Sequence, residues 1–428
     1  MESHDFSSDI IYEILTRSSM ETVGRCRLLS KECNRITYDS IFTNLHNQRT
    51  NTISGYFMQS MMSNIFYSSF VSIDSTTWRS YPKLSLNFLP DRVEIQGSTN
   101  QGILLCRTHH PRYYVCKPTT KQWRRIPNPK TRYHTLATGM IVIRSNPLHY
   151  QIVRFSQPRP RCHDKEFYQY YWVRCELFDS KTWTWKQLDE VKLQNHETLS
   201  RKPAVSVSGS LHWLTWVENN IIAFHVSKES YSMFSLPLSV SEDYKGKDIE
   251  LVEYMGKLAV TCIGEDESSM ELWVMENYGK TEWNKRYKIN FEALRRKEPD
   301  TRPAAFYNAD IVLMKQYDHR VTFFNFKNGN IDRLSLENNV NHGCFRFQSD
   351  FEPSDLTGGF ALKHPQGKRG IRKSKRRKSL TKYSIGQLGF RQFFALTSSK
   401  SFLILLLAFS FFLLCFRFLD SHIIVVED

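Results

Sequence analysis

The chain has 428 residues, which leaves room for two or three domains, and its 14% aromatic content is ample for a packed core. Its net charge is +15, but ten lysines and arginines and no acidic residue lie between Lys363 and Lys382. The rest of the chain therefore carries only +5, and specific nucleic-acid binding is not indicated. The nine cysteines are scattered without a CxxC pair, which argues against a disulfide scaffold or zinc module and favours reduced thiols in a cytosolic or nuclear protein.

The segment from Phe6 to Phe42 has apolar residues at the spacing of short helices. We predict three helices, with Ser8, Ser19 and Ser30 as their N-caps. Their apolar residues are, in chain order, Ile10, Ile11, Ile14 and Leu15, then Val23, Cys26 and Leu29, then Cys33, Ile36 and Ile41. Helices of about ten residues take most of their stability from packing, so this unit is expected to pack on something else.

This segment resembles an F-box. The residues that carry the resemblance are Asp9-Ile10-Ile11, Glu13-Ile14-Leu15, Arg17, Arg25, Arg27, Ser30-Lys31 and Phe42. The sequence departs from the family pattern at three places. Phe6-Ser7 and Ser18-Ser19 each stand in place of Leu-Pro, and Cys33 stands in place of Trp. The resemblance implies that residues 1–46 are an F-box domain that binds a Skp-type adaptor and, through it, a cullin. The residues expected to bind the adaptor are Ile10, Ile14, Leu15, Val23, Leu29 and Ile36. An ordinary helical cap on the next domain is the alternative.

After the helices, the pattern changes to short aromatic and β-branched segments separated by polar turns. One unit recurs, an apolar strand followed by a polar turn and an aromatic or apolar residue about eight positions on. The five copies are 114–123, 177–185, 223–231, 272–283 and 322–331. About four strands per fifty residues is typical of a propeller blade. Segments 53–95 and 340–362 are candidates to close a sixth blade; a β-sandwich is the alternative, and the aromatic residues at strand ends are expected in the core.

A second resemblance, over about residues 50–360, is to the plant F-box-associated (kelch-like) domain. It rests on the phrases Ser54-Gly55-Tyr56-Phe57, Asn100-Gln101-Gly102-Ile103-Leu104-Leu105-Cys106, Tyr114-Val115-Cys116 with Trp123-Arg124-Arg125-Ile126-Pro127, Tyr150-Gln151-Ile152-Val153, Gly209-Ser210-Leu211-His212-Trp213-Leu214 and Phe234-Ser235-Leu236-Pro237. The double glycine of ordinary kelch repeats is absent. In that family the domain recruits a target protein for ubiquitination. The resemblance therefore implies an all-β, propeller-like domain over 50–362 that binds a protein target.

The C-terminal part has two features. Residues 363–400 begin with the basic run, which is poor in apolar groups and is expected to be a disordered linker. This run could be a nuclear-import address, a non-specific nucleic-acid contact or the cytosolic flank of a membrane segment. Residues 402–419 are apolar except for Ser410 and Arg417 and are long enough for a candidate transmembrane helix. The layout is that of a tail-anchored protein on the cytoplasmic or nuclear face; a buried C-terminus is the alternative.

Sequence signatures of catalysis or cofactor binding are absent. The chain has no GxSxG, HExxH, P-loop or GxGxxG motif. His109-His110, Cys162-His163-Asp164 and Glu265-Asp266-Glu267 are short clusters that we interpret as solvated loops rather than metal sites. We therefore predict no cofactor, no metal and no enzymatic activity.

The sequence as a whole predicts an α+β multidomain chain: three F-box helices, an all-β propeller, a basic linker and a candidate membrane helix. The leading hypothesis is a non-catalytic substrate-recognition subunit of an SCF-type (Skp–cullin–F-box) ubiquitin ligase. The alternative is a membrane-tethered protein-binding module whose F-box has decayed, motivated by Ser18-Ser19, Cys33 and residues 402–419.

Overall fold

The computed structural model describes residues 3–72, 84–158, 170–194, 197–200, 202–216, 220–237, 240, 248–264, 268–299, 301–316, 320–336 and 343–357. All of them belong to Met1–Gln366, the first of the two units into which the chain divides. The whole predicted linker, residues 363–400, and the whole predicted membrane span, residues 402–419, lie outside the described residues and stay predictions. Within the described ranges, no helix is long and apolar enough to cross a membrane.

The chain begins with four helices rather than the predicted three. They are α1 (Ser3–Thr16), α2 (Met20–Leu29), α3 (Lys31–Thr37) and α4 (Ser40–Thr50). Ser19 and Ser30 cap α2 and α3, as predicted, by accepting backbone N–H bonds. The prediction of three helices was wrong because Asp39 is also a cap, and Ile41 therefore belongs to α4. The predicted cap Ser8 lies inside α1.

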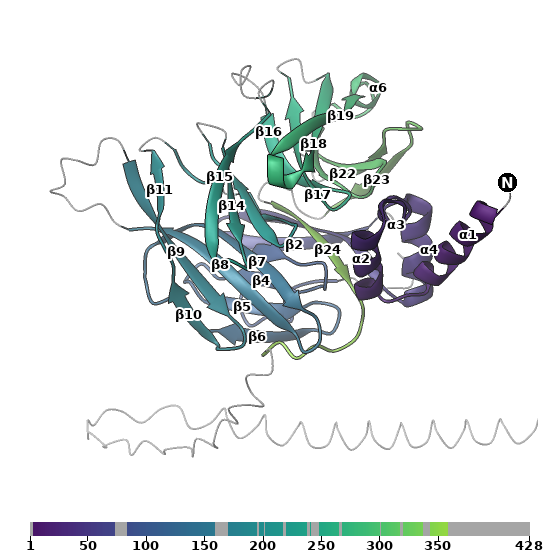
Figure 1. Ribbon diagram of the computed structural model, residues 1–428. Helices are drawn as coiled ribbons and strands as arrows, with labels where there is room; N and C mark the ends of the chain where they lie inside the picture. Colours follow the sequence, from purple (N-terminus) through teal and green to yellow (C-terminus); the bar gives the residue numbers. More distant parts are fainter. Residues whose placement is uncertain are drawn as a thin grey trace, which may run out of the picture. The chain divides into compact units, whose positions relative to one another are not determined.

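The strands form six antiparallel sheets, the blades of a β-propeller (Figure 1). The first blade is β24 (Gly343–Ser349), β1 (Ile53–Met62) and β2 (Ile65–Val71). The second is β3 (Glu94–Ser98), β4 (Leu104–Arg107), β5 (Tyr113–Lys117) and β6 (Gln122–Ile126). The third is β7 (His134–Arg144), β8 (His149–Gln157), β9 (Tyr170–Asp179), β10 (Thr184–Gln187) and β11 (Val191–Gln194).

The remaining three blades have four strands each. The fourth is β12 (Val205–Val207), β13 (Ser210–Leu214), β14 (Asn220–His225) and β15 (Ser230–Ser235). The fifth is β16 (Asp248–Tyr254), β17 (Lys257–Ile263), β18 (Ser269–Asn277), the 3₁₀ turn η1 (Tyr278–Lys280) and β19 (Glu282–Asn290). After α6 (Glu292–Arg295), the sixth is β20 (Arg302–Phe306), β21 (Ile311–Lys315), β22 (Arg320–Asn325) and β23 (Ile331–Ser335).

All five predicted hairpins are confirmed, and so is the sixth blade. Their pairings are Cys116↔Trp123, Phe178↔Trp185, Phe224↔Tyr231, Met275↔Trp283 and Phe324↔Ile331. The sixth sheet comes from both predicted segments, because β24 pairs with β1 from Ile53↔Ser349 to Gln59↔Gly343. A late strand thus closes the ring onto an early one, which leaves few open sheet edges.

The hydrophobic core is divided into six clusters, one between each pair of neighbouring blades. For example, one cluster joins the third and fourth blades around Phe155 and Trp213, and another joins the sixth and first around Tyr56 and Phe323. Six interfaces between six blades make a closed ring, which decides against the alternative of a β-sandwich. Trp123 does not follow the expectation of a core position, since it lies 42% exposed on the outer strand β6.

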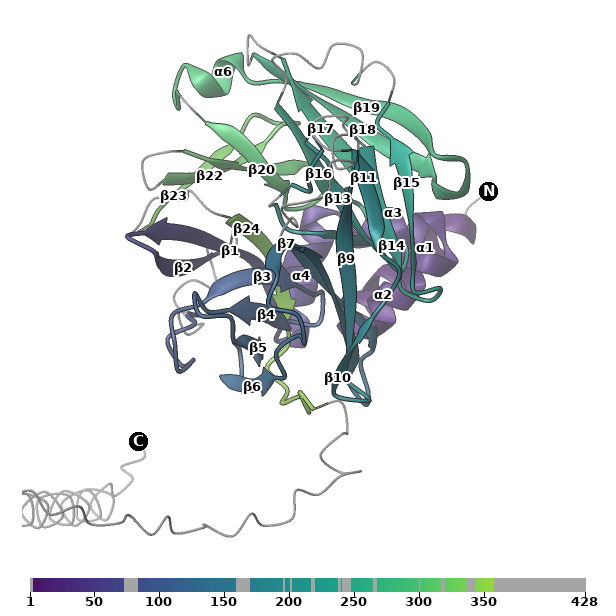
Figure 2. The same ribbon diagram turned by 90° about the vertical axis from the view of Figure 1, so that its left-hand side faces the viewer.

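The helices lie on one side of the propeller. In Figure 1 they are to the right of the sheets, and in Figure 2, seen from the left-hand side, they lie behind them. The last helix ends at Thr50, past the expected boundary at 46, and β1 begins only three residues later. A connection this short keeps the helical unit close to the first blade.

Candidate functional site

The helical unit has a small core of its own. Leu15, Val23 and Phe42 are almost fully buried and come from α1, α2 and α4. The Tyr12 ring packs edge-on against the Phe42 ring with their centroids 5.4 Å apart, and the His46 ring stacks on the same Phe42 ring at 5.8 Å. His46 Nε2 donates to the Ser18 carbonyl oxygen at 2.9 Å, and burial lowers the pKa of this imidazole, so the neutral form is favoured. These contacts link the helices of the unit around one small shared core.

Six large apolar side chains of the helical unit stay exposed. We call them the exposed apolar set: Ile10, Ile11, Ile14, Leu28, Leu29 and Ile41. Leu28 and Leu29 are 88% and 84% exposed, and Ile14 is 59% exposed. Such a density of exposed apolar side chains on a short segment is typical of a protein–protein interaction surface.

The residues predicted to bind an adaptor fall into two groups. Ile10, Ile14 and Leu29 are on the surface and available to a partner. Leu15 and Val23 lie in the helical core instead, and Ile36 is half-buried against it. The sequence analysis did not select Leu28 and Ile41. The adjacent pair Leu28-Leu29 could have indicated that one of the two is exposed, because two consecutive helical residues cannot both point into one narrow core.

Tyr38, between α3 and α4, joins the helices to the propeller. Its side chain is 6% exposed, and its hydroxyl donates to Glu253 Oε1 at 3.4 Å. Its carbonyl oxygen accepts the backbone N–H of Ala309 at 3.3 Å. Arg346 Nη1 on β24 lies 3.0 Å from Glu253 Oε2, and this carboxylate raises the pKa of Arg346 although burial opposes it. The contact places the helices on the turns between the first and second strands of the fifth and sixth blades.

The central channel of the propeller contains a cavity of about 550 Å³. It is lined by the innermost strands of all six blades, β24, β3, β7, β12, β16 and β20. Its charged side chains include Lys202, which lies 2.5 Å from Glu250, and Lys315. Leu28 of α2 also lines this cavity, so the helical unit lies at one end of the channel.

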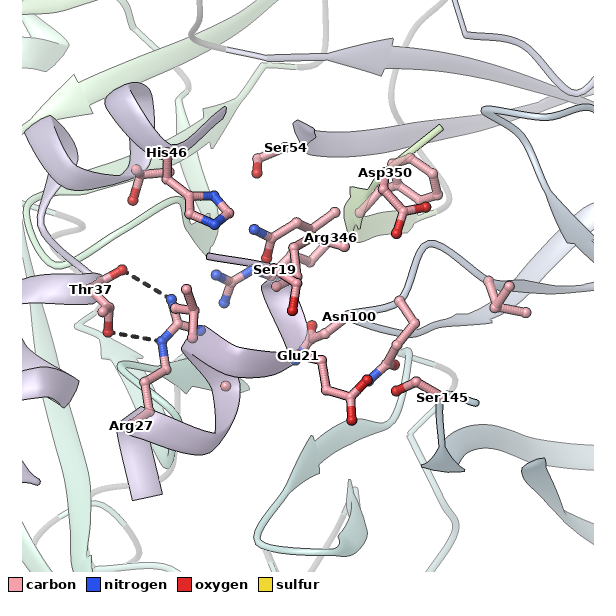
Figure 3. A pocket seen from close by; sticks show the side chains of 18 of the residues that line it. Ser19, Glu21, Arg27, Thr37, His46, Ser54, Asn100, Ser145, Arg346 and Asp350 are labelled. Carbon is pink, nitrogen blue, oxygen red and sulfur yellow. Dashed lines mark hydrogen bonds between the residues drawn. The ribbon is translucent and has the colours of Figure 1, made fainter. Parts of the chain in front are cut away.

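A second cavity of about 550 Å³ lies between the helices and the propeller, and we call it the helix–propeller cavity. Figure 3 shows its polar walls: Ser19, Glu21 and Arg27 from the helices, and Ser54, Asn100, Ser145, Arg346 and Asp350 from the propeller side. Arg27 Nε and Nη2 donate to Thr37 Oγ1 and O, both at 3.0 Å. The guanidinium also lies 3.9 Å from the centre of the Tyr38 ring. The cavity therefore adjoins the Tyr38 contact.

Metal-ligating side chains do not gather within the described residues, where no group of three or more His, Cys, Asp or Glu could hold an ion. His109 and His110 are exposed neighbours in the turn after β4. Cys162-His163-Asp164 and Glu265-Asp266-Glu267 lie outside the described residues. The described part of the chain thus offers an exposed apolar set and two cavities whose linings mix polar and apolar side chains.

Comparison with curated proteins identifies relatives of this chain among plant F-box proteins. It is 40% identical to F-box protein At5g41720 of Arabidopsis thaliana over 158 residues, which cover 35% of this chain and 84% of that protein. It is 27% identical to F-box protein At5g49610 of the same plant over 292 residues, covering 65% of this chain and 77% of that protein. Among solved structures, a chain of a nidogen/laminin complex matches with a TM-score of 0.41 and 11% identity over 70% of this chain and 99% of that one; this score is too low to bear on function.

The family comparison is more direct. A family model described as the F-box associated beta propeller domain matches residues 57–347. These limits run from β1 to β24, the two strands that close the ring. No catalytic family is indicated by these matches. With the relatives above and the helices that precede β1, this match shows that the chain belongs to the plant F-box proteins that carry an F-box-associated β-propeller domain.

Proposed function

We propose that this protein is a substrate-recognition subunit of an SCF-type ubiquitin ligase. In this proposal the helices bind a Skp-type adaptor, and the propeller holds the protein target near the ligase, so that its local concentration rises. In this proposal the chain itself catalyses no reaction. The ubiquitin transfer would occur elsewhere in the complex.

The observation that carries this proposal is the exposed apolar set on a unit whose own core is already filled. Leu15, Val23 and Phe42 fill that core, so Ile14 and Leu29 have no partner to pack against within it. Burying a Leu or Ile side chain on a partner is worth about 1.5–3 kcal/mol. A few such residues are enough for a stable adaptor contact.

The target would bind at the end of the propeller away from the helices. Leu28 of α2 lines the channel cavity, so the helices already cover the end of the propeller on their side. Two tryptophans are half-exposed at the free end: Trp172 near the start of β9 and Trp216 after the end of β13. The ammonium of Lys192 lies 5.9 Å from the ring of Trp172. Exposed Trp beside a cation is typical of energetically important interface positions.

The adaptor contact is tested by capture of the full-length protein on a purified Skp-type adaptor. The wild type should bind, and the double variant Ile14→Asp with Leu29→Asp should not, because a carboxylate buried in an apolar interface costs several kcal/mol. Met233→Asp is the matched control, since Met233 is an exposed apolar residue of the propeller. Failure of the wild type to bind, or equal capture of the double variant, would refute the proposal.

The target end is tested with the same protein in plant cells. We expect Trp172→Ala with Trp216→Ala to keep adaptor capture and to lose the proteins that become ubiquitinated in an adaptor-dependent way. Trp123→Ala, an exposed tryptophan on the outer strand of the second blade, is the control. An unchanged set of ubiquitinated proteins in the double variant would place the target elsewhere on the propeller.

A second candidate function is a membrane-tethered binding module without a ligase role. The apolar residues 402–419 after a basic run favour tethering, with the folded unit on the cytoplasmic or nuclear face. Membrane fractionation of the full chain beside a chain lacking 398–428 tests this candidate. Recovery of both in the soluble fraction contradicts the tether, and membrane recovery without adaptor capture favours it over the ligase subunit.

A further inference from the structure

Four cationic side chains line the helix–propeller cavity, and three of them are paired. The pairs are Arg25 with Glu21, Lys117 with Asp350 and Arg346 with Glu253. Arg27 is the fourth, and no carboxylate among the described residues lies within ion-pair distance of it. Glu253 is the nearest candidate, but it is already shared by Tyr38 and Arg346. The walls of the cavity therefore carry an excess of positive charge.

Arg27 also has donor capacity to spare. Two of its five N–H donors, on Nε and Nη2, are bonded to Thr37, and the guanidinium also interacts with the Tyr38 side chain. Figure 3 shows Arg27 held against Thr37 at one wall, with Arg346 beside it. Burial lowers the pKa of Arg27, and the neighbouring charge of Arg346 lowers it further, whereas Tyr38 and Glu253 act to raise it. A half-buried cation beside a second one is costly unless an anion balances it.

The cavity offers neutral donors near these arginines. Asn100 and Gln101 of the β3–β4 turn line it, as do Ser19 and Ser145. Asn308, which is 6% exposed, uses its Oδ1 to accept two backbone N–H groups, and its Nδ2 has no partner. The volume of about 550 Å³ is within the range of about 300–1,000 Å³ that small-molecule pockets occupy.

We infer that the helix–propeller cavity binds a small oxyanion, a phosphate ester or a polycarboxylate, between Arg27 on α2 and Arg346 on β24. A guanidinium presents two parallel N–H donors that match two oxygens of a phosphate or carboxylate. The ligand would contact the helical unit and the propeller together. It would therefore stabilise their contact by mass action. Leu28 of the exposed apolar set also lines this cavity, whereas Arg27 and Arg346 belong to neither the adaptor surface nor the target surface.

The test is thermal unfolding of the full-length protein at constant ionic strength, titrated with inorganic pyrophosphate and, in a second series, with citrate. The melting temperature should rise and saturate with at least one of them, and the series that does so identifies the class of oxyanion. Arg27→Gln should weaken the apparent affinity at least tenfold. This variant also loses its bonds to Thr37 and could fail to fold, so a second variant is needed.

Asn100→Asp is that second variant, because Asn100 is exposed in a turn and the change adds a carboxylate to the cavity wall. It should also weaken the affinity at least tenfold, whereas Arg125→Gln, on the exposed face of β6, should stay within twofold of the wild type. Absence of a saturable rise with both probes overturns the inference. Undiminished binding by Asn100→Asp overturns it as well, since the anion would then bind elsewhere, for example at the basic run 363–382.

Discussion

The helices and the propeller of this chain differ in how many of their large apolar side chains are exposed. Of the large hydrophobic side chains that are exposed within the described residues, six lie on α1, α2 and α4 and eight on the whole propeller. The helices span Ser3–Thr50, whereas the propeller extends from Ile53 to Ser349. The helical unit is thus several times richer in exposed apolar side chains per residue.

This difference follows from how each part closes. Every blade buries its faces against two neighbours, and the pairing of β1 with β24 leaves no blade without one. Four short helices around Leu15, Val23 and Phe42 have no such closure, and their apolar surplus faces outward. The propeller buries most of its apolar residues within its own ring, whereas the helices leave apolar residues that only a partner could bury. Mutations in the two regions should therefore change the free energy of unfolding by different amounts.

The largest expected effect is a cavity in the propeller core. Trp213 is 1% exposed and meets Phe155 edge-on at 5.0 Å. Trp213→Ala should lower the free energy of unfolding by about 3–5 kcal/mol, because the ring is lost and the void is only partly refilled. Denaturant unfolding followed by circular dichroism of the strands measures this loss.

Trp216→Ala is the matched control, because Trp216 is three residues further along and 55% exposed. It should change the unfolding free energy by about 0.5–1 kcal/mol at most, in line with exposed positions. Equal losses of unfolding free energy in the two variants would mean that Trp213 does not lie in a closed core between the third and fourth blades.

Acid should act next most strongly, also through the propeller. Burial lowers the pKa of His212 to about 4; its Nδ1 donates to the Val205 carbonyl oxygen, and its Nε2 accepts from Tyr278 at 2.6 Å. In the unfolded chain the pKa is about 6.5, so the neutral imidazole stabilises the fold above pH 6.5 and this contribution is lost as the pH falls toward 4. The loss should reach about 3 kcal/mol.

Unfolding curves between pH 7 and pH 4 measure this effect. His212→Gln, which cannot take up a proton, should flatten the pH dependence in this window, whereas His109→Gln, at an exposed position, should leave it unchanged. If His212→Gln keeps the full slope, other groups cause the acid loss and the buried histidine is not its source.

Local patterns predicted much of this fold. The caps Ser19 and Ser30 and the five hairpins depend on neighbours within about ten residues, and the structure has all of them. The split between α3 and α4 was missed because Asp39 lies inside a continuous apolar stripe, where its capping role is hidden. The pairing of β1 with β24 could be expected only because the sequence repeats account for five blades and leave two unpaired segments, one at each end of the domain.

The site was less predictable, because it depends on contacts between distant residues. Tyr38 and Glu253 are separated by 215 positions, and no periodicity links them. Helical spacing placed Ile14 and Leu15 on one face, but it cannot say which of two neighbours faces the core. Arg27 was noted as part of a motif, and its position in a cavity follows only from the docking of the helices on the propeller.

A smaller effect is expected where the two parts meet. Gly256 has φ +75°, and a Cβ on it would lie 2.9 Å from the Tyr38 hydroxyl. Gly209 is in the equivalent turn of the fourth blade, has φ +71° and has no atom within 4 Å. Alanine at either position should cost about 1 kcal/mol for the left-handed backbone, but only Gly256→Ala should displace Tyr38 and loosen the helices.

Hydrogen exchange of residues 38–50 in the two glycine variants distinguishes these costs. Faster exchange in Gly256→Ala alone would show that the Tyr38 contact holds the helical unit in place. Equal exchange in both variants would mean that the helices keep their position without this contact, and the two parts would then be more independent than the structure indicates.

The smallest effect on stability is expected at the exposed apolar set, and it tests the comparison most directly. Ile14→Ser and Leu29→Ser remove side chains that are 59% and 84% exposed, so the unfolding free energy should change by less than about 0.5 kcal/mol. Leu15→Ser, one position away and 3% exposed, should unfold the helices. The two surface changes should also reduce binding of a hydrophobic dye and self-association of the free chain, because the apolar surplus is smaller. If they destabilise the helices as much as Leu15→Ser does, these residues serve the fold, and the helical unit is as closed as the propeller.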